Sequence, residues 1–173
     1  MKYLIGICIG FFIGVSFIIS FTSSPKSARA EENISSAHIN EKHIRCMAMA
    51  IYFESKNEPL VGQLAVGLVV KNRAESGMFP KDICDVVYEG PLDSNGKPIL
   101  NRCQFSWYCD GIPEKILDNL MWEKLMFISN LILSNKIFDF TDGALFFHNT
   151  SVNPRWKLKK IVAIGNHIFY KKT

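Results

Sequence analysis

Hydrophobic residues recur at helical spacing in three long stretches of the chain. They follow an i, i+3, i+4, i+7 pattern from Glu41 to Phe53, and they form a broad apolar face over residues 59–72. The third stretch, from Pro113 to Ser134, predicts the longest helix, with buried residues Ile116, Leu117, Leu120, Met121, Leu125, Ile128, Leu131 and Ile132. We expect Asn40 to cap the first helix and Pro59 to begin the second.

The pattern changes in the last quarter of the chain. Residues 144–148 and 161–170 are short β-prone runs, and Gly165-Asn166 predicts a bend or bulge in the second run. A short helix or turn is expected at Asp82–Glu89, followed by an exposed loop from Gly90 to Arg102 that is rich in turn residues. Helices followed by a small antiparallel β element predict an α+β domain.

The N-terminal stretch has a different character from the rest. Residues 4–21 are uncharged and mostly apolar, and Ala28-Arg29-Ala30 follows them as a small-residue cleavage pattern. This arrangement predicts a signal peptide at 1–30. The alternative is an uncleaved membrane anchor, because roughly 18 apolar residues can span a bilayer. Residues 31–40 are then a polar, flexible lead-in, and residues 41–173 form the folded domain.

Charge and cysteine content narrow the class of protein. The formal net charge is +4, and loss of the predicted signal peptide, with its three basic residues, leaves +1. A nearly neutral domain does not indicate nucleic-acid binding. Four cysteines remain after residue 30, which favours two disulfides in an exported protein, with three pairings open. These are Cys46, Cys84, Cys103 and Cys109, and their spacing lacks the short C-x₂₋₄-C knuckles of zinc sites. We therefore expect no metal, and we expect no other cofactor.

Glu54 is the candidate catalytic residue. It lies at the predicted end of the first helix, where the negative end of the helix dipole disfavours a carboxylate. Desolvation by Tyr52 and Phe53 acts in the same direction, so the pKa of Glu54 is expected to be raised. A carboxyl group that is protonated near neutral pH suits glycosidic-bond cleavage. The alternative is an ordinary surface glutamate at a helix end.

Several motifs, in order along the chain, resemble the cell-wall hydrolase family of the SleB/CwlJ type. They are Ala50–Pro59, Gly62–Val66, Val70–Arg73, Phe79-Pro80, Cys84–Tyr88, Cys103–Ser106, Cys109–Gly111, Phe147–Asn149, Pro154–Trp156 and Ile164–Tyr170. The resemblance implies a lysozyme-like, lytic transglycosylase-like fold with one catalytic glutamate, matching Glu54. It further implies cleavage of peptidoglycan between N-acetylmuramic acid and N-acetylglucosamine, often with a 1,6-anhydro product.

The chain departs from the family next to this glutamate. The family usually reads Glu-Ala-Arg-Gly-Glu, whereas this chain reads Glu54-Ser55-Lys56-Asn57-Glu58. We expect Asn57 to adopt the left-handed conformation that glycine would supply. Lys56 keeps the positive charge without the guanidinium fork, which leaves the fine recognition of substrate open.

Further residues are candidates for substrate contact. Glu58 is either a second carboxylate or, as we favour, the cap of the second helix. Hydrogen-bonding and aromatic side chains could contact sugars, and several of them could equally hold the fold together. The candidate substrate-binding residues are Tyr52, Glu58, Gln104, Phe105, Ser106, His148, Asn149 and Trp156.

Three functions remain open from the sequence. The first is a lytic transglycosylase, the second is a conventional hydrolase with a second carboxylate such as Glu58, and the third is a non-catalytic glycan-binding or membrane-tethered module. The expected partner is the glycan strand of peptidoglycan, and the sequence identifies no protein partner. We expect an exported protein, periplasmic or cell-wall associated, unless residues 4–21 tether it to the membrane.

Overall fold

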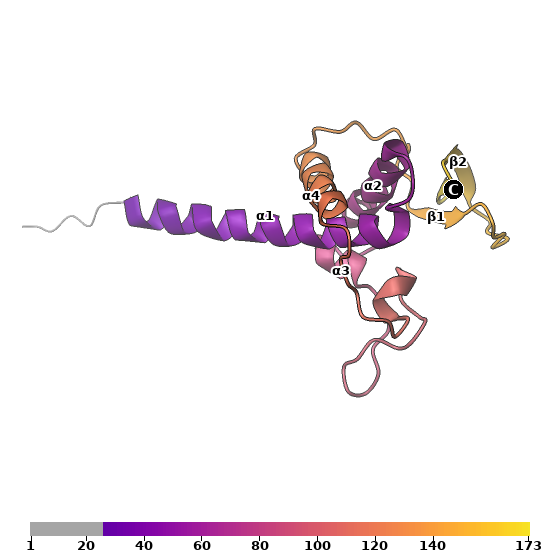
Figure 1. Ribbon diagram of the computed structural model, residues 1–173, viewed down its shortest axis with the longest axis horizontal. Coiled ribbons are helices and arrows are strands. Elements are labelled where there is room, and N and C mark those ends of the chain that lie inside the picture. The colour runs from indigo at the N-terminus through magenta and orange to yellow at the C-terminus, as the bar shows by residue number, and fades with distance from the viewer. Residues whose placement is uncertain (1–25) are drawn as a thin grey trace, which may run out of the picture.

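A computed structural model describes the chain from Lys26 to Thr173, with side chains from Glu41 onward (Figure 1). Helices come first and strands last in this part of the chain, as the sequence predicted. The helices are α1 (Lys26–Ser55), α2 (Leu60–Ser76), α3 (Ile83–Val87), the 3-10 helix η1 (Ser106–Cys109) and α4 (Asn119–Leu133). The strands are β1 (Phe146–Asn149), β2 (Lys159–Ile164) and β3 (His167–Lys171). The α+β class is therefore confirmed.

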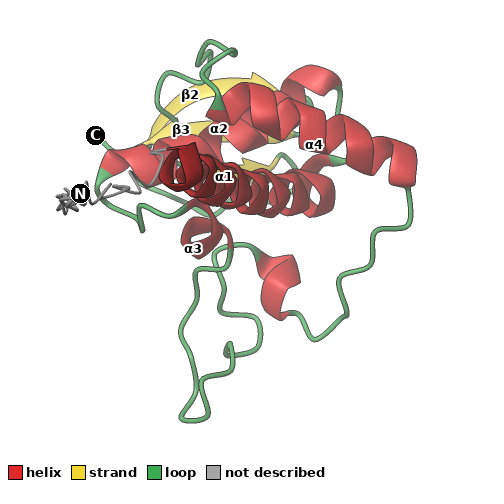
Figure 2. Ribbon diagram, turned by 90° about the vertical axis from the view of Figure 1, so that its left-hand side faces the viewer, coloured by secondary structure: helices red, strands yellow, loops and turns green. Residues whose placement is uncertain are grey.

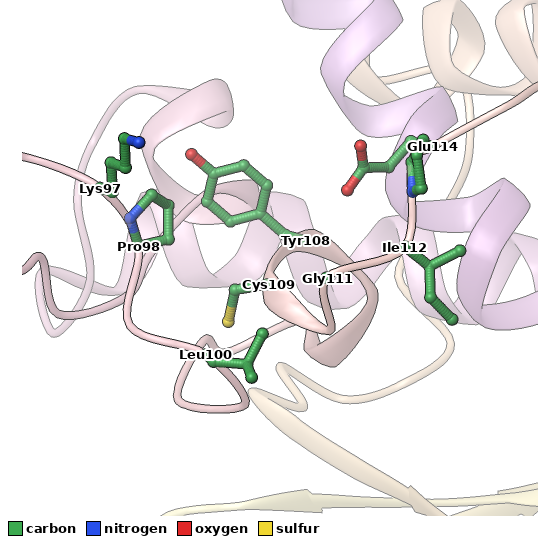
Figure 3. A pocket seen from close by; sticks show the side chains of 9 residues that line it. Lys97, Pro98, Leu100, Tyr108, Cys109, Gly111, Ile112 and Glu114 are labelled. Carbon is green, nitrogen blue, oxygen red and sulfur yellow. The ribbon is translucent and has the colours of Figure 1, made fainter.

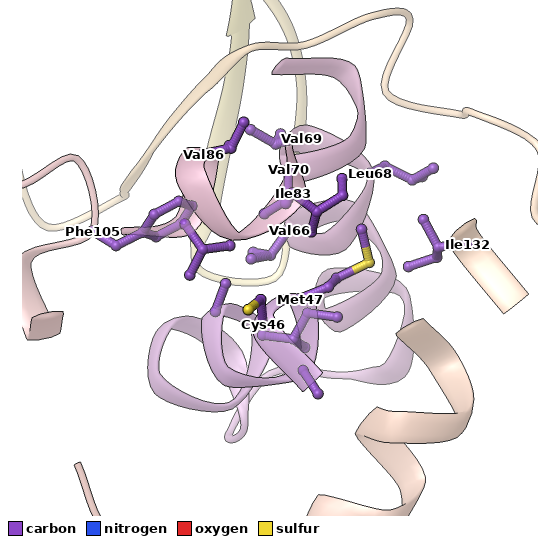
Figure 4. Packing of buried hydrophobic residues seen from close by; sticks show 14 of the residues in the cluster. Cys46, Met47, Val66, Leu68, Val69, Val70, Ile83, Val86, Phe105 and Ile132 are labelled. Atoms are coloured by element: carbon purple, nitrogen blue, oxygen red, sulfur yellow. The ribbon is translucent and has the colours of Figure 1, made fainter. Parts of the chain in front are cut away.

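The C-terminal half of α1 is the central element of the domain. It packs against α2, α3 and α4, while the other half of the helix extends away from the domain (Figures 1 and 2). Met47, Ala48 and Ile51 on this half are fully buried, in a core that they share mainly with apolar residues of α2 and α3 (Figure 4). Burial of apolar side chains around α1 thus holds the helix end where the candidate site lies.

The strands form one antiparallel sheet in the order β1-β3-β2. The second β-prone run is a hairpin of two strands, because Gly165-Asn166 forms the turn between β2 and β3. Phe147 pairs with Phe169, and Asn149 pairs with His167, so these four side chains share one face of the sheet. Phe169 and His167 are buried on that face, which therefore lies toward the helices.

Two predicted helix starts are wrong. Helix α1 begins at Lys26, so Asn40 lies inside the helix and does not cap it, and the expected lead-in at 31–40 is helical. Helix α4 begins at Asn119, six residues after Pro113, because Asp118 caps it by accepting a hydrogen bond from the Met121 amide (2.9 Å).

The segment before α4 is extended because Tyr52 holds it to α1. The Tyr52 hydroxyl accepts hydrogen bonds from the amides of Leu117 (3.1 Å) and Asp118 (3.3 Å). Leu117 and Leu120 are 82% and 81% exposed, in contrast to the burial that a longer helix predicted. The buried side of α4 consists instead of Leu125, Ile128, Ser129 and Ile132.

Two disulfides settle the open pairing. Cys46–Cys84 joins α1 to α3. Cys103–Cys109 joins two cysteines six residues apart, the second of which is the last residue of η1. The loop from Gly90 to Arg102 is largely exposed, as predicted. The second disulfide therefore pins the base of this loop next to η1.

The predicted membrane-tether segment, residues 4–21, lies outside the described residues. No helix within 26–173 has the length and apolarity needed to cross a membrane.

Gly67 is predicted to resist substitution by alanine. A Cβ atom there would lie 2.6 Å from Ile132 Cδ1 and 2.9 Å from Ile51 Cδ1, so the glycine allows α1, α2 and α4 to approach closely. Alanine favours a helix by roughly 1 kcal/mol over glycine, but overpacking costs about 1–3 kcal/mol. Gly67→Ala should lower the midpoint of thermal unfolding. A higher midpoint would show that helix propensity prevails over this contact.

Candidate active site

Glu54 lies in the last turn of α1, where the helix meets the sheet and the β2–β3 turn. It lines a cavity of about 300 Å³ whose other walls come from the turn after α1 and from the edge of the sheet. The lining residues are Phe53, Glu54, Ser55, Lys56, Asn57, Glu58, Asn149, Asn166 and His167. The structure thus brings together three of the predicted site residues, namely Glu54, Glu58 and Asn149.

The electrostatic environment of Glu54 favours the protonated acid. Burial raises its pKa from 4.5 to about 7, and the positive charge of Arg73 opposes this rise. The predicted direction of the pKa shift is therefore confirmed, and its dominant cause is desolvation. A carboxyl group with a pKa close to neutral can both release and take up a proton under ordinary conditions.

Arg73 is the buried cation behind Glu54. It is 5% exposed, its Nε donates a hydrogen bond to the Leu145 carbonyl (2.8 Å), and its guanidinium lies over the rings of Phe79 and Phe105. Burial lowers its pKa to about 10, while Glu89 and Glu54 raise it, so Arg73 remains charged at neutral pH. Its charge can stabilise the Glu54 carboxylate when the acid loses its proton.

Glu58 does not cap α2, contrary to our favoured prediction. Helix α2 has no side-chain cap, and the Glu58 carboxylate instead accepts hydrogen bonds from the Asn166 amide (2.9 Å) and Asn166 Nδ2 (3.0 Å). Burial raises the pKa of Glu58, but these two bonds and nearby His167 outweigh burial and lower it. Gly165 has a φ of +56° and no room for a Cβ atom beside the Glu58 carboxylate. Glu58 therefore fastens the β2–β3 turn to the end of α1.

The turn after α1 is built without a left-handed residue at position 57. The backbone φ of Asn57 is not positive, so the predicted left-handed conformation is wrong. Backbone hydrogen bonds form the turn, from the Lys56 amide to the Tyr52 carbonyl and from the Glu58 amide to the Ser55 carbonyl. Buried Gln63 of α2 closes it by donating to the carbonyls of Lys56 and Glu58, both at 3.1 Å.

The loop around η1 does not line the Glu54 cavity, although we predicted substrate contacts from its residues 104–106. Phe105 is 1% exposed and packs in the core beside Arg73, so its ring presents no open face for a sugar. Gln104 and Ser106 are exposed, but neither is among the residues that line the Glu54 cavity. Tyr52 is buried and borders a separate cavity of about 190 Å³. Its hydroxyl is already engaged by the segment before α4.

His148 and Trp156 lie on the outer face of the sheet. His148 stacks on Tyr170 and bonds its hydroxyl (2.9 Å), and Trp156 packs edge-on against both rings. Residues 147 and 149 of β1 face the helices, so the strand alternation directs His148 away from the Glu54 cavity. His148 and Trp156 therefore do not line the Glu54 cavity, and their contact with substrate stays a prediction.

Sequence reasoning missed several residues of the site, among them Arg73, Asn166 and His167. Arg73 was part of a motif but was not recognised as a buried charge, because a sequence does not show which arginine loses its solvent. Asn166 was interpreted only as part of a bend. His167 lay within a motif but was not a candidate; it is buried, it lines the cavity, and burial holds its pKa below the usual value. The motif that contains residues 166 and 167 was the available signal.

The cavity offers acid–base chemistry from its own side chains. No group of three or more His, Cys, Asp or Glu residues within the described part of the chain is placed to hold a metal ion. Besides Glu54 and Glu58, the polar lining of the cavity includes the amides of Asn57, Asn149 and Asn166 and the imidazole of His167.

Two solved structures share this arrangement of helices and sheet. The catalytic domain of the germination-specific lytic transglycosylase SleB from Bacillus anthracis aligns with a TM-score of 0.52 and 27% identity, covering 75% of this chain and 93% of that domain. The catalytic domain of Bacillus cereus SleB aligns with a TM-score of 0.54 and 28% identity, covering 75% and 89%. The fold is therefore that of a lytic transglycosylase-like α+β domain.

The sequence comparisons identify the family. The profile described as cell wall hydrolase matches residues 57–170. The chain belongs to the cell wall hydrolase family, as the motif resemblance predicted. The spore cortex-lytic enzyme of Bacillus cereus is 42% identical over 141 residues, which cover 76% of this chain and 45% of that protein. The Bacillus subtilis spore cortex-lytic enzyme is 28% identical over 153 residues, which cover 85% and 44%. The chain therefore spans less than half the length of these relatives.

Replacing Glu54 by glutamine should change how stability depends on pH. In the folded chain the pKa of Glu54 is about 7, above its usual value of 4.5, so the unfolded chain loses this proton at lower pH. The free energy of unfolding therefore falls as the pH rises from about 4.5 to 7. Glu54→Gln removes this loss. We expect the variant to be more stable than wild type at pH 8 by about 1–3 kcal/mol, and nearly equal at pH 4.

Urea unfolding at the two pH values measures this difference. Glu123→Gln, at an exposed position on α4, is the matched control and should shift stability equally at both. A Glu54→Gln effect that is the same at pH 4 and pH 8 would contradict the raised pKa.

Proposed function

We propose that this chain cleaves the glycan strands of peptidoglycan between N-acetylmuramic acid and N-acetylglucosamine, with Glu54 as its acid and base. The observation that carries the proposal is a single carboxyl group with a pKa near 7 in an open cavity at the helix–sheet junction. Family membership and the likeness to the catalytic domain of a lytic transglycosylase support it. The family profile begins at residue 57, so the role of Glu54 rests on its environment.

In the first step, protonated Glu54 donates its proton to the oxygen that links the two sugars. The bond between that oxygen and the anomeric carbon of N-acetylmuramic acid breaks, and positive charge develops on the sugar. Glu54 becomes a carboxylate, which the positive charge of Arg73 stabilises from behind.

In the second step, the Glu54 carboxylate takes the proton from the 6-hydroxyl of the same muramic acid. The 6-oxygen then bonds to the anomeric carbon and gives a 1,6-anhydro sugar. Glu54 recovers its proton, and no water is consumed. A carboxyl group with a pKa near 7 suits this double role, because neither protonation state is strongly disfavoured at neutral pH.

Hydrolysis with Glu58 as a second carboxylate is less well supported. Both Glu58 oxygens accept hydrogen bonds from Asn166, which fastens the cavity wall. A carboxylate held in this way is poorly placed to activate water without releasing the β2–β3 turn. We therefore favour the one-carboxylate reaction.

Glu54→Gln should abolish peptidoglycan cleavage. Glutamine cannot transfer a proton, and loss of a general acid–base group lowers rates by about 10²- to 10⁴-fold. Release of soluble fragments from purified sacculi measures the rate, and mass spectrometry of those fragments identifies the product. We expect 1,6-anhydro ends from the wild-type chain.

The result separates the candidate functions. Fragments with reducing ends and no anhydro sugar would contradict transglycosylation and favour hydrolysis. Binding to sacculi without any fragment release would favour a non-catalytic glycan-binding module. Glu123→Gln is the control for loss of a carboxylate elsewhere and should cleave at the wild-type rate.

We also propose that residues 1–30 direct export and that the domain acts outside the cytoplasm. The cleavage pattern at Ala28-Arg29-Ala30 and the two disulfides of the domain support this location. N-terminal sequencing of the exported protein should find Glu31 as its first residue. An intact N-terminus in the membrane fraction would indicate an uncleaved anchor instead.

A further inference from the structure

Another cavity, of about 400 Å³, lies between the loop at 97–100 and the segment at 111–114 (Figure 3). The aromatic ring of Tyr108 stands between these two walls. The lining residues are Lys97, Pro98, Leu100, Tyr108, Cys109, Gly111, Ile112, Pro113 and Glu114. None of them lines the Glu54 cavity, so this is a separate site.

A disulfide and hydrogen bonds within the chain hold the walls of this cavity in place. The Cys103–Cys109 disulfide closes the base, and the Asn101 amide donates to the Cys109 carbonyl (2.7 Å). Asp93 orders the turn before Lys97 by accepting hydrogen bonds from the amides of Asn95 (2.8 Å) and Lys97 (2.9 Å). The backbone of the site is therefore preformed.

Opposite charges face each other across Tyr108. The Lys97 ammonium extends toward the ring from one wall, and the Glu114 carboxylate extends toward it from the other (Figure 3). Both residues are exposed, and within the described residues neither side chain takes part in a hydrogen bond or an ion pair. Leu100 and Ile112 add apolar surface below them (Figure 3). A ligand that fits would carry an anion, a cation and a short apolar part.

Aromatic contacts connect this cavity to the Glu54 cavity. Phe53, which lines the Glu54 cavity, stacks on Trp107 with ring centroids 4.9 Å apart, and Trp107 contacts Tyr108 at 6.3 Å. The Trp107 ring thus links Phe53 of the Glu54 cavity to Tyr108 of this cavity. One aromatic cluster therefore borders both the Glu54 cavity and this cavity.

We propose that the Lys97–Tyr108–Glu114 cavity binds the peptide stem of peptidoglycan through a residue that carries both a carboxylate and an amino group. This inference rests on the proposed function, because peptidoglycan is the polymer in which charged peptides branch from the glycan. Lys97 pairs with the peptide carboxylate, Glu114 pairs with the amino group, and Tyr108 packs against the aliphatic part between them.

The test measures binding of a free stem peptide to the full chain, without any cleavage step. The probe is a tripeptide ending in meso-diaminopimelate, titrated by calorimetry or by NMR shifts. Two matched probes have either the side-chain amino group acetylated or the carboxylates amidated. We expect each blocked probe to bind about two- to fivefold more weakly, because each loses one exposed charge pair.

Variants assign each charge to its wall. Lys97→Glu should weaken binding of the free tripeptide more than loss of one pair does, because attraction becomes repulsion. Glu114→Gln should bind the acetylated and the free tripeptide equally. Lys115→Ala, at the exposed position next to Glu114, is the control and should bind like wild type. No binding of the tripeptide, or binding that Lys97→Glu leaves unchanged, would overturn the proposal.

A parallel assay separates this inference from the proposed function. Cleavage of sacculi is compared with cleavage of glycan from which an amidase has removed the peptides, and wild type should prefer the former. Equal rates on both, with no tripeptide binding, would leave glycan cleavage intact and reject the peptide site. Charge-dependent tripeptide binding without cleavage of either polymer would support the peptide site and reject the proposed function.

Discussion

The buried guanidinium of Arg73 is the interaction on which the site depends. One side chain from the end of α2 bonds the Leu145 carbonyl just before β1 and lies over the Phe105 ring beside η1. It also provides the positive charge that opposes the raised pKa of Glu54. Because burying a charge is costly unless partners surround it, Arg73 links α2 to the segment before β1 and to the loop that carries Phe105.

The cavity wall depends on a second, weaker constraint. Glu58 follows α1 by only a few residues, but it bonds the turn between the last two strands. The chain therefore closes on itself at the candidate site, with the end of α1 on one side and Asn166 and His167 on the other. Neither side forms a cavity alone, which explains why residues distant in sequence belong to one site.

Hydrophobic periodicity predicted the elements better than their ends. The pattern over 41–53 located the buried half of α1, because apolar spacing reports which face meets the core. It also assigned Leu117 and Leu120 to a buried helix face, where the structure leaves them exposed. The segment that contains Leu117 is bonded to the Tyr52 hydroxyl, a contact across 65 residues. Periodicity cannot detect a polar group that captures backbone amides from a distant part of the chain.

The sequence by itself determined the family, the α+β class and the acidic residue with a raised pKa. These depend on local motifs, on apolar spacing and on the place of Glu54 at a helix end. Only the tertiary structure decided the disulfide pairing, the burial of Arg73 and the bond between Glu58 and Asn166. It also placed Phe105 in the core and His148 on the outer face of the sheet. Each of these outcomes depends on which distant groups exclude water from one another, and no local pattern encodes that.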